Sequence, residues 1–336
     1  VGTTVWDYMM LHRMFSRSER DNNKLDTIGK EEVGEEKLPL SNGYKTYKTN
    51  WDEWVEYNVQ DVNLLVSIDR KMKLIETSMG VCSQARIPFD GIWESKKLIV
   101  GFLINYLHDR NMVFPPIREH KSETFPGAFV FSKPGLKKNL VSYDYRSMYP
   151  SIAMSGNISI EQMVQFLDRD PTDEEFAELV VSPVDGVFFK KENDGIIPSV
   201  MKLLFDGRTV LKDEMKKAIR EARIADAEYL DMKQNSYKLY GNTLYGMLGL
   251  KYFQFYNLKC AHSVTAFGVD LIKYTITQIS DYFDGAMATD ERFAKSFGAY
   301  PTLDPEMKGY NRFSHGDTDS FFIIYDDIFA PYEALK

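Results

Sequence analysis

The sequence lacks several features that would define a protein class at once. Only two of its 336 residues are cysteine, Cys82 and Cys260, and no C-x-x-C pattern occurs. This argues against a disulfide framework or a zinc site and suits a reducing compartment. No apolar run approaches the roughly 20 residues that span a bilayer, and no signal-peptide pattern opens the chain. Internal repeats and low-complexity tracts are also missing.

The chain is also short of positive charge. Its formal net charge is −8, which taken alone speaks against nucleic acid as a partner. That objection is weak, because residues 196–249 hold nine Lys or Arg against seven Asp or Glu. An apolar content of 44% and an aromatic content of 14% predict a globular protein with a sizeable core and two or three domains.

Hydrophobic periodicity gives a coarse layout. The second expected helix carries apolar residues at Val55, Val59, Val62, Leu65 and Ile68. Residues 114–135 are rich in Pro, Gly and charge and predict a linker, whereas residues 284–311 predict an exposed excursion. A strand is expected at LVSYDY, followed by a turn and a short helix, and another strand closes the chain. We predict helices over 5–16, 25–40 (with a charged loop), 52–79, 92–110, 196–223, 226–249 and 261–283.

The stretch SHGDTDSFFII (314–324) places Asp317 and Asp319 at the head of an apolar run. In an extended strand, residues i and i+2 face the same way, so both carboxylates would crowd one side of a sheet edge. Such crowding is costly unless a cation joins the charges. Gly316 and Asp317 also supply turn chemistry, which predicts a tight hairpin tip. A solvated Asp-rich turn is the plain alternative for this stretch alone.

A second stretch, VSYDYRSMYPSI (141–152), places Asp144 at the carboxyl end of a short apolar strand. Its carboxylate would then be able to face the hairpin tip. Tyr149 precedes Pro150 and is expected to be extended or in a turn. The alternative is an ordinary joint between strand and turn, in which Asp144 accepts backbone N–H bonds.

The third stretch, KQNSYKLYGNTLYGMLG (233–249), aligns Lys238, Asn242 and Tyr245 on one helical face. That face suits a phosphate with a base pair stacked beside it. Gly241 and Gly246 are costly inside a helix and are tolerated where another backbone or a ligand must come close. Arg208 and Lys212 share a face of the preceding helix, so two antiparallel helices would present three cations, with Lys238, to one polyanion. The plain alternative is a solvated basic face.

Together the three stretches resemble the family B DNA-directed DNA polymerases, especially viral replicative enzymes such as those of T-even bacteriophages. DYRSMYPS is similar to motif A, with Met148 in place of the usual leucine. KLYGNTLYG is similar to motif B, with Thr243 where serine is common, and HGDTDS to motif C, with His315 in place of tyrosine. Two shorter stretches are weaker matches: FPGAFV (125–130) to the Y-x-G-[GA] signature, and YNVQD, with Tyr57 and Asp61, to the third exonuclease motif.

The resemblance implies an α+β multidomain fold. It would combine a polymerase palm (a ferredoxin-like antiparallel sheet with helices) with helical-hairpin fingers, preceded by the helical tail of an RNase H-like exonuclease domain. The implied division is the carboxyl-terminal part of a 3′–5′ exonuclease domain (1–78), a linker or amino-terminal-domain segment (79–135), palm (136–195), fingers (196–249) and palm again (250–336).

The resemblance also implies template-directed DNA synthesis, in which deoxynucleoside monophosphates are added to a primer 3′-hydroxyl. Two Mg²⁺ ions, or Mn²⁺ in their place, would be held by Asp144, Asp319 and the backbone carbonyl of Tyr145, with Asp317 as an accessory catalytic carboxylate. The nucleotide would meet the backbone amides of Ser147 and Met148, the side chains of Arg208, Lys212 and Lys238, the sugar-selecting ring of Tyr149, and Asn242 and Tyr245 beside the base pair. Lys238 would share in catalysis.

Some family features are missing. The first two exonuclease motifs and the K-K-R-Y segment are not found, so we expect a fragment without a thumb and without exonuclease activity. The expected partners are primer–template DNA and deoxynucleoside triphosphates, with a sliding clamp or a separate carboxyl-terminal polymerase chain as further candidates, and no membrane. The expected location is the cytoplasm of an infected host cell.

Two other functions remain in competition. A template-independent or RNA-making palm polymerase would use the same carboxylates, although the bulk of Tyr149 argues against ribonucleotides. A catalytically silent DNA-binding or assembly subunit would be expected to lose carboxylates that this chain keeps. A metal-dependent nuclease is disfavoured, because only Asp61 of its acidic set is present.

Overall fold

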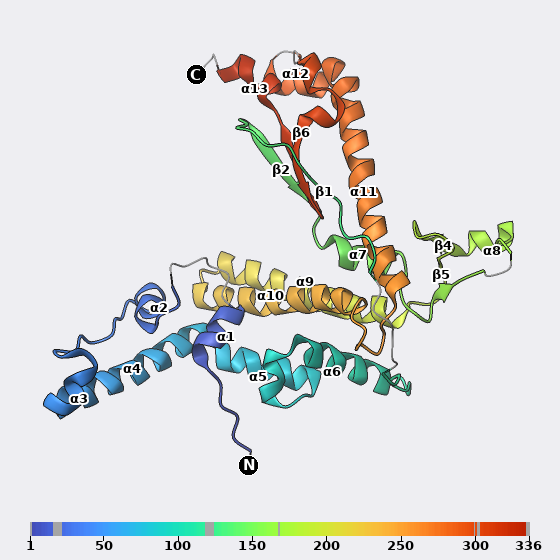
Figure 1. Cartoon of the computed structure of the whole chain (residues 1–336). Helices are drawn as coiled ribbons and strands as arrows, with labels where there is room; N and C mark the ends of the chain where they lie inside the picture. Colours follow the sequence, from blue (N-terminus) through green and yellow to red (C-terminus); the bar gives the residue numbers. More distant parts are fainter. Residues whose placement is uncertain are drawn as a thin grey trace. The chain divides into compact units, whose positions relative to one another are not determined.

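The computed structural model describes residues 2–15, 22–117, 124–166, 169–298, 300 and 303–333. It combines helices with two antiparallel sheets, which confirms the predicted α+β class (Figure 1). The chain forms two compact units, which are described separately. The first unit comprises residues 1–115 and 202–244, and the second comprises residues 116–201 and 245–336.

The first unit is helical among its described residues. Two long helices, α9 (Ile196–Arg220) and α10 (Ile224–Met247), contribute most of their length to it and form a hairpin. Phe102 and Tyr240 join α6 to α10, with their ring centroids 5.9 Å apart. The remaining elements are α1 (Tyr8–Phe15), α2 (Leu25–Glu32), η1 (Gly43–Lys45), α3 (Thr46–Thr49), α4 (Trp51–Met72), α5 (Leu74–Ala85), η2 (Phe89–Trp93) and α6 (Ser95–His108).

The single helix expected over residues 52–79 is wrong. The chain forms α4 and α5 there, because Lys73 adopts a left-handed conformation with φ of 53° and breaks the helix. The expected apolar stripe is also largely wrong, since only Ile68 of its five residues is buried. The buried face of α4 instead runs through Leu64, Ile68 and Met72, which recur every four residues.

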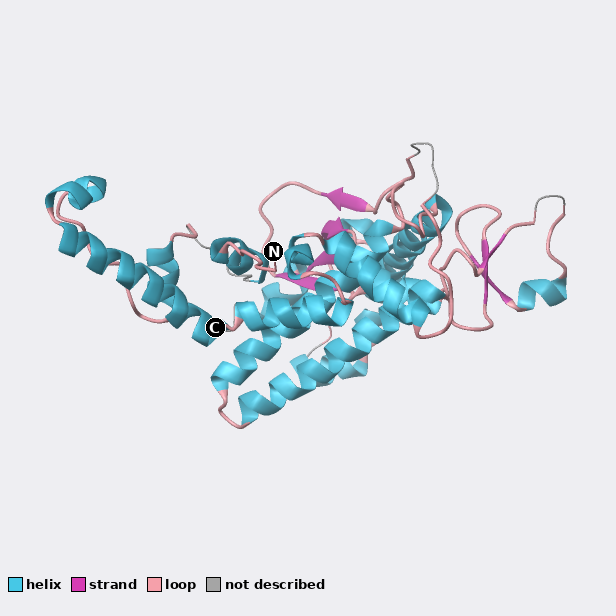
Figure 2. Ribbon diagram, turned by 90° about the horizontal axis from the view of Figure 1, so that it is seen from below, coloured by secondary structure: helices cyan, strands magenta, loops and turns pink. Residues whose placement is uncertain are grey.

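The second unit is built on a four-stranded antiparallel sheet with strand order β1-β6-β7-β2 (Figures 1 and 2). Its strands β6 and β7 form a hairpin, and β2 pairs with the outer side of β7. The long helix α11 follows the predicted interval 261–283 closely. The elements here are β1 (Val130–Ser132), β2 (Leu140–Asp144), α7 (Met148–Ser155), α11 (Leu258–Asp284), η3 (Ala286–Thr289), α12 (Glu291–Phe297), η4 (Pro305–Met307), η5 (Gly309–Arg312), β6 (Phe313–Asp317), β7 (Ser320–Ile324) and α13 (Asp326–Glu333).

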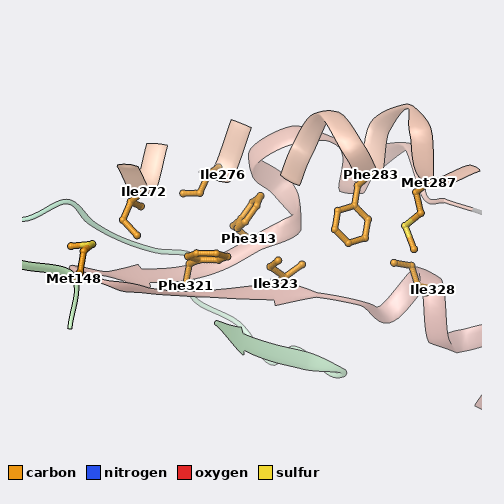
Figure 3. Close-up of a cluster of buried hydrophobic side chains, with 9 residues drawn as sticks. All are labelled: Met148, Ile272, Ile276, Phe283, Met287, Phe313, Phe321, Ile323 and Ile328. Carbon is orange, nitrogen blue, oxygen red and sulfur yellow. The ribbon is translucent and has the colours of Figure 1, made fainter. Parts of the chain in front are cut away.

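An apolar core fixes this sheet against α11 (Figure 3). The alternation of strand residues sends Phe321 and Ile323 of β7 to the same face as Phe313 of β6. Ile272 and Ile276, one turn apart, meet them from α11. Burial of such side chains stabilises a fold by about 1.5–3 kcal/mol each, so this core holds the hairpin rigidly.

A second, three-stranded sheet has no counterpart among the predicted elements. It consists of β3 (Met163–Val164), β5 (Phe188–Lys190) and β4 (Leu179–Val181), in that order, and α8 (Asp173–Ala177) lies beside it (Figure 2). Its strands are only two or three residues long, so they leave almost no periodic signal in the sequence.

The predicted linker over residues 114–135 needs correction at its carboxyl-terminal end. Residues 118–123 lie outside the described residues, but β1 pairs with β6 and adds an edge strand to the main sheet. The Pro and Gly residues that suggested a linker lie on both sides of this strand and do not exclude it.

A buried ion pair closes the far end of the hairpin. The Arg312 guanidinium donates two hydrogen bonds to the Asp327 carboxylate, at 2.8 and 2.7 Å, and lies 4.5 Å from the Phe283 ring centroid. Both charged side chains are almost fully buried. Burial would raise the pKa of Asp327, but hydrogen bonds from Arg312 and from the Asp304 amide lower it overall.

We expect Asp327→Asn to lower the free energy of unfolding by about 3–5 kcal/mol, because it leaves a buried guanidinium without a counter-charge. Since the folded pKa of Asp327 is depressed, its contribution is complete above the ordinary carboxyl pKa and is lost as pH falls through the lower folded value. Denaturant unfolding across acidic pH measures both effects.

Two controls accompany this measurement. Arg312→Met with Asp327→Leu should recover most of the lost stability, because no charge remains buried. Asp281→Asn, at an exposed position on α11, should change little. Unchanged unfolding of Asp327→Asn would show that the ion pair contributes nothing.

Candidate active site

The hairpin between β6 and β7 presents two of the predicted carboxylates. Asp317 pairs with Ser320, so Thr318 and Asp319 form a two-residue tip, and Thr318 has a left-handed φ of 59°. The predicted hairpin is therefore confirmed, but its tip is not at Gly316 and Asp317, which belong to β6. Because Asp319 lies in the turn, the argument that both carboxylates face one side of a single strand does not hold.

The neighbouring strand β2 brings the third carboxylate to the same end of the sheet. Asp144 is the last residue of β2 and pairs with Ser320, directly after the tip. The Tyr145 amide donates to the Asp319 carbonyl oxygen at 2.8 Å. The expectation that Asp144 faces the hairpin tip is thus supported by the register. The side chains of Asp144 and Asp317 are exposed there.

The segment that contains β1 holds the hairpin tip from its other side, and the sequence motifs did not indicate this contact. The Phe129 carbonyl accepts a hydrogen bond from the Thr318 amide at 3.2 Å, and β1 continues this contact along β6. A Cβ at Gly316 would lie only 2.3 Å from Cε1 of Phe131, so glycine is required for the ring to pack there. The aromatic-rich stretch FVFS was the available signal.

The turn after β2 has a strained backbone. Ser147 has φ of 56° and ψ of 43°, in the left-handed region that serine rarely occupies, and α7 begins directly after it. Such strain is often found at ligand-binding positions. The side chain of Met148 is buried in the core, so only its backbone is available to a ligand.

Tyr149 belongs to the motif A stretch and lies in α7, so it is helical rather than extended or in a turn as expected. Its ring centroid is 4.6 Å from that of Tyr245, so the structure brings together two residues that the sequence assigned to separate motifs. Burial, and then the nearby Asp319 and Asp317 carboxylates, raise the pKa of Tyr149. Burial and Tyr149 likewise raise the pKa of Tyr245. Both phenols therefore stay neutral at physiological pH and can donate hydrogen bonds.

The basic residues of the helical hairpin belong to the first unit. Arg208 of α9 donates from Nε to Oε1 of Gln234 on α10 at 2.9 Å. Gln234 precedes Lys238 by one helical turn, so the bond supports the predicted shared face of the two helices. Asn242 follows Lys238 by another turn and is exposed. Lys212 lies one turn beyond Arg208 on α9.

Gly241 and Gly246 of the third stretch have free space around them. An added Cβ at Gly241 or Gly246 would meet no atom within 4 Å among the described residues. Close approach of another part of this backbone therefore does not explain them, and approach of a ligand stays a prediction.

Tyr57 and Asp61 lie together on α4, and a lysine occupies the space beside both. The Lys37 ammonium is 2.7 Å from Asp61 and 4.7 Å from the Tyr57 ring centroid. Burial would lower the pKa of Lys37, but Asp61 and Tyr57 raise it overall. Lysine thus supplies the positive charge beside this carboxylate.

In the described parts of the chain, no group of three or more His, Cys, Asp and Glu side chains is arranged to hold a metal ion. Nor does any helix in those parts have the length and apolar character needed to cross a membrane.

The family model described as "DNA polymerase family B" matches residues 93–328, more than half of the chain. The "DNA-directed DNA polymerase" of Enterobacteria phage T4 is 26% identical over 97% of this chain, and that of Escherichia phage RB69 is 25% identical over 97%. The chain covers 41% and 40% of the lengths of these curated relatives.

A solved structure gives the same answer for the fold. The family B DNA polymerase from the hyperthermophilic archaeon Pyrobaculum calidifontis aligns with a TM-score of 0.60 and 25% identity. The alignment covers 90% of this chain and 36% of that one.

Proposed function

The chain belongs to DNA polymerase family B, as its three motifs predicted, and we propose that it performs template-directed DNA synthesis. One observation carries the proposal: the β2–β7 register places Asp144 beside a hairpin tip that already bears Asp317 and Asp319. Three carboxylates at one end of the sheet lower the stability of the fold, because like charges repel. They suit a site that works with divalent cations.

The predicted division of the chain follows from the same family membership. In this proposal the four-stranded sheet and α11 are the palm, contributed by 136–195 and 250–336 with β1 added at the edge of the sheet, and the α9–α10 hairpin is the fingers, contributed by 196–249. Residues 1–78 are the tail of an exonuclease domain, and residues 79–135 connect it to the palm. The antiparallel sheet and the paired long helices support these roles.

The donor set fits Mg²⁺. Mg²⁺ prefers oxygen ligands and keeps several waters, and in phosphate-transferring sites it is bound through one or two carboxylates plus substrate phosphates. Asp144, Asp319 and the Tyr145 carbonyl would provide such a partial set. Asp317 would tune the local charge. Two bound ions, Mg²⁺ or Mn²⁺, would lower the pKa of the primer 3′-hydroxyl and neutralise negative charge on the triphosphate.

The remaining residues would bind and orient the nucleotide. The Ser147 and Met148 amides, at the start of α7, would donate to the triphosphate, as helix amino termini do for anions. Arg208, Lys212 and Lys238 would stabilise charge that grows on its outer oxygens. The Tyr149 ring would lie beneath the sugar and exclude a 2′-hydroxyl. Tyr245 and Asn242 would border the nascent base pair, whose shape reports base identity.

Primer extension by the full-length protein tests this function. We expect single additions of the deoxynucleotide complementary to each of the four template bases, because pairing selects the base that fits the site. Omission of the template should abolish addition. A set of four primer–templates that differ at one template position measures this directly.

Each competing function gives another outcome. Addition without a template would indicate a template-independent transferase, and equal use of ribonucleotides would indicate an RNA-making enzyme. DNA binding without any extension would favour the silent subunit. All three outcomes contradict the proposal.

The phage relatives suggest the biological setting. The relatives from phages T4 and RB69 support a role in viral DNA replication, in the cytoplasm of an infected host. A sliding clamp and a separate carboxyl-terminal polymerase chain stay predictions of the family resemblance.

A further inference from the structure

Gly268 occupies an unusual position in the interior of α11. Glycine within a helix costs about 1 kcal/mol relative to alanine, so its presence there needs a reason. The reason is contact with α7. A Cβ at Gly268 would lie 2.9 Å from Cε of Met148 and 2.9 Å from Cε1 of Tyr149. Real Cβ contacts are essentially never that short, so a neighbour would have to move.

The two neighbours differ in how readily they can move. Cε is the flexible end of the Met148 side chain, and methionine adapts to small changes in volume. Cε1 belongs to the rigid ring of Tyr149, so it moves only if the whole ring tilts or shifts. The ring's freedom is limited, because Tyr245 packs against it at 4.6 Å between centroids.

The Tyr149 atom that an added Cβ would meet lies near the hydroxyl end of the ring, because Cε1 adjoins the carbon that bears the hydroxyl. A push at Cε1 therefore displaces the hydroxyl end of Tyr149.

We propose that Gly268 is a positioning residue for sugar selection: its missing side chain lets the Tyr149 ring sit against α11. This inference rests on the proposed role of Tyr149 beneath the sugar. Gly268 itself touches no substrate. It sets how far the Tyr149 ring stands out from α11.

The test uses Gly268→Ala in the full-length protein and measures kcat/KM for single additions of a deoxynucleotide and its matching ribonucleotide. We expect the ratio of deoxynucleotide to ribonucleotide kcat/KM to fall by about tenfold, because sub-ångström displacement of a positioning group has effects of this order. The deoxynucleotide loses a fitted contact, whereas the ribonucleotide already fits poorly.

Gly80→Ala is the matched control. Gly80 also lies inside a helix, α5, but an added Cβ there meets no described atom within 4 Å. The same methyl group is therefore added to a helix without a clash. Gly80→Ala should leave the ratio unchanged and leave stability equal or slightly higher.

Tyr149→Ala and the double variant Gly268→Ala, Tyr149→Ala separate the inference from the proposed function. With the ring removed, Gly268→Ala should have no further effect on the ratio, so the two substitutions should be strongly non-additive. An additive result would mean that Gly268 acts through general packing and would overturn the inference. So would a ratio for Gly268→Ala that is unchanged or higher.

The remaining outcomes are also decisive. If Tyr149→Ala alone leaves the ratio unchanged, the proposed role of Tyr149 fails and the inference fails with it. If Tyr149→Ala alters the ratio and Gly268→Ala does not, only the inference fails. Should Gly268→Ala not fold, recovery of folding in the double variant would establish the clash with Tyr149, and its absence would refute it.

Discussion

Replacing Asp319 or Asp144 by asparagine is expected to reduce templated primer extension at least about a thousandfold. Metal-ion catalysis contributes several kcal/mol to transition-state stabilisation, and each 1.36 kcal/mol is tenfold in rate. The amide keeps the size of the side chain but is a much weaker ligand. Single-turnover extension at saturating Mg²⁺ measures the loss.

The local charges predict that this loss is catalytic rather than structural. Asp144 and Asp317 are exposed at the ends of β2 and β6, the two strands that flank β7, so loss of one negative charge should leave thermal unfolding unchanged or slightly improved. Asp317→Asn should be milder in activity, in keeping with an accessory role. Asp185→Asn, at an exposed position elsewhere in the same unit, is the matched control. Activity of Asp319→Asn close to that of the parent would refute the site.

Tyr149→Ala should raise ribonucleotide incorporation relative to deoxynucleotide incorporation by at least about tenfold, because it removes the ring that excludes the 2′-hydroxyl. Deoxynucleotide addition should slow to a smaller extent, because Tyr245 loses an aromatic neighbour worth about 0.5–1.5 kcal/mol. The measurement is the ratio of the two kcat/KM values.

A second tyrosine provides the control. Tyr143 is an exposed residue of β2 whose ring stacks on Phe321, with centroids 5.8 Å apart. Tyr143→Ala removes a similar ring from the same unit and should not alter sugar preference. If the ratio for Tyr149→Ala equals that of the parent, Tyr149 is a packing residue and sugar selection lies elsewhere.

The polar motifs could be predicted from the sequence because their chemistry is local. A two-residue spacing of Asp317 and Asp319 before an apolar run, and Asp144 at a strand end, are visible without any partner. The turn chemistry of Gly316 and Asp317 even predicts a hairpin. It does not fix which residues form the tip, because that depends on the register with β7, and register is a pairing property.

The helix over residues 52–79 shows the limit of periodicity. Nothing in composition marks Lys73 as a break, because lysine is an ordinary helix former. Its left-handed conformation is the backbone state of a single residue between α4 and α5, and the periodicity of a sequence window does not record it. Such a window also does not show that Val55, Val59 and Val62 are exposed, since apolar character alone does not say which face of the helix packs against a neighbour.

The sequence by itself determined the family, the order of the three motifs and the identity of the three carboxylates, because these depend on residue type and spacing along the chain. Only the tertiary structure decided how Phe129 and Phe131 hold the hairpin tip, and how Gly268 and Tyr245 enclose Tyr149. These contacts join residues up to 189 positions apart, as Phe129 and Thr318 are. They exist because antiparallel pairing and close packing bring backbone and rings together, and no local pattern records that proximity.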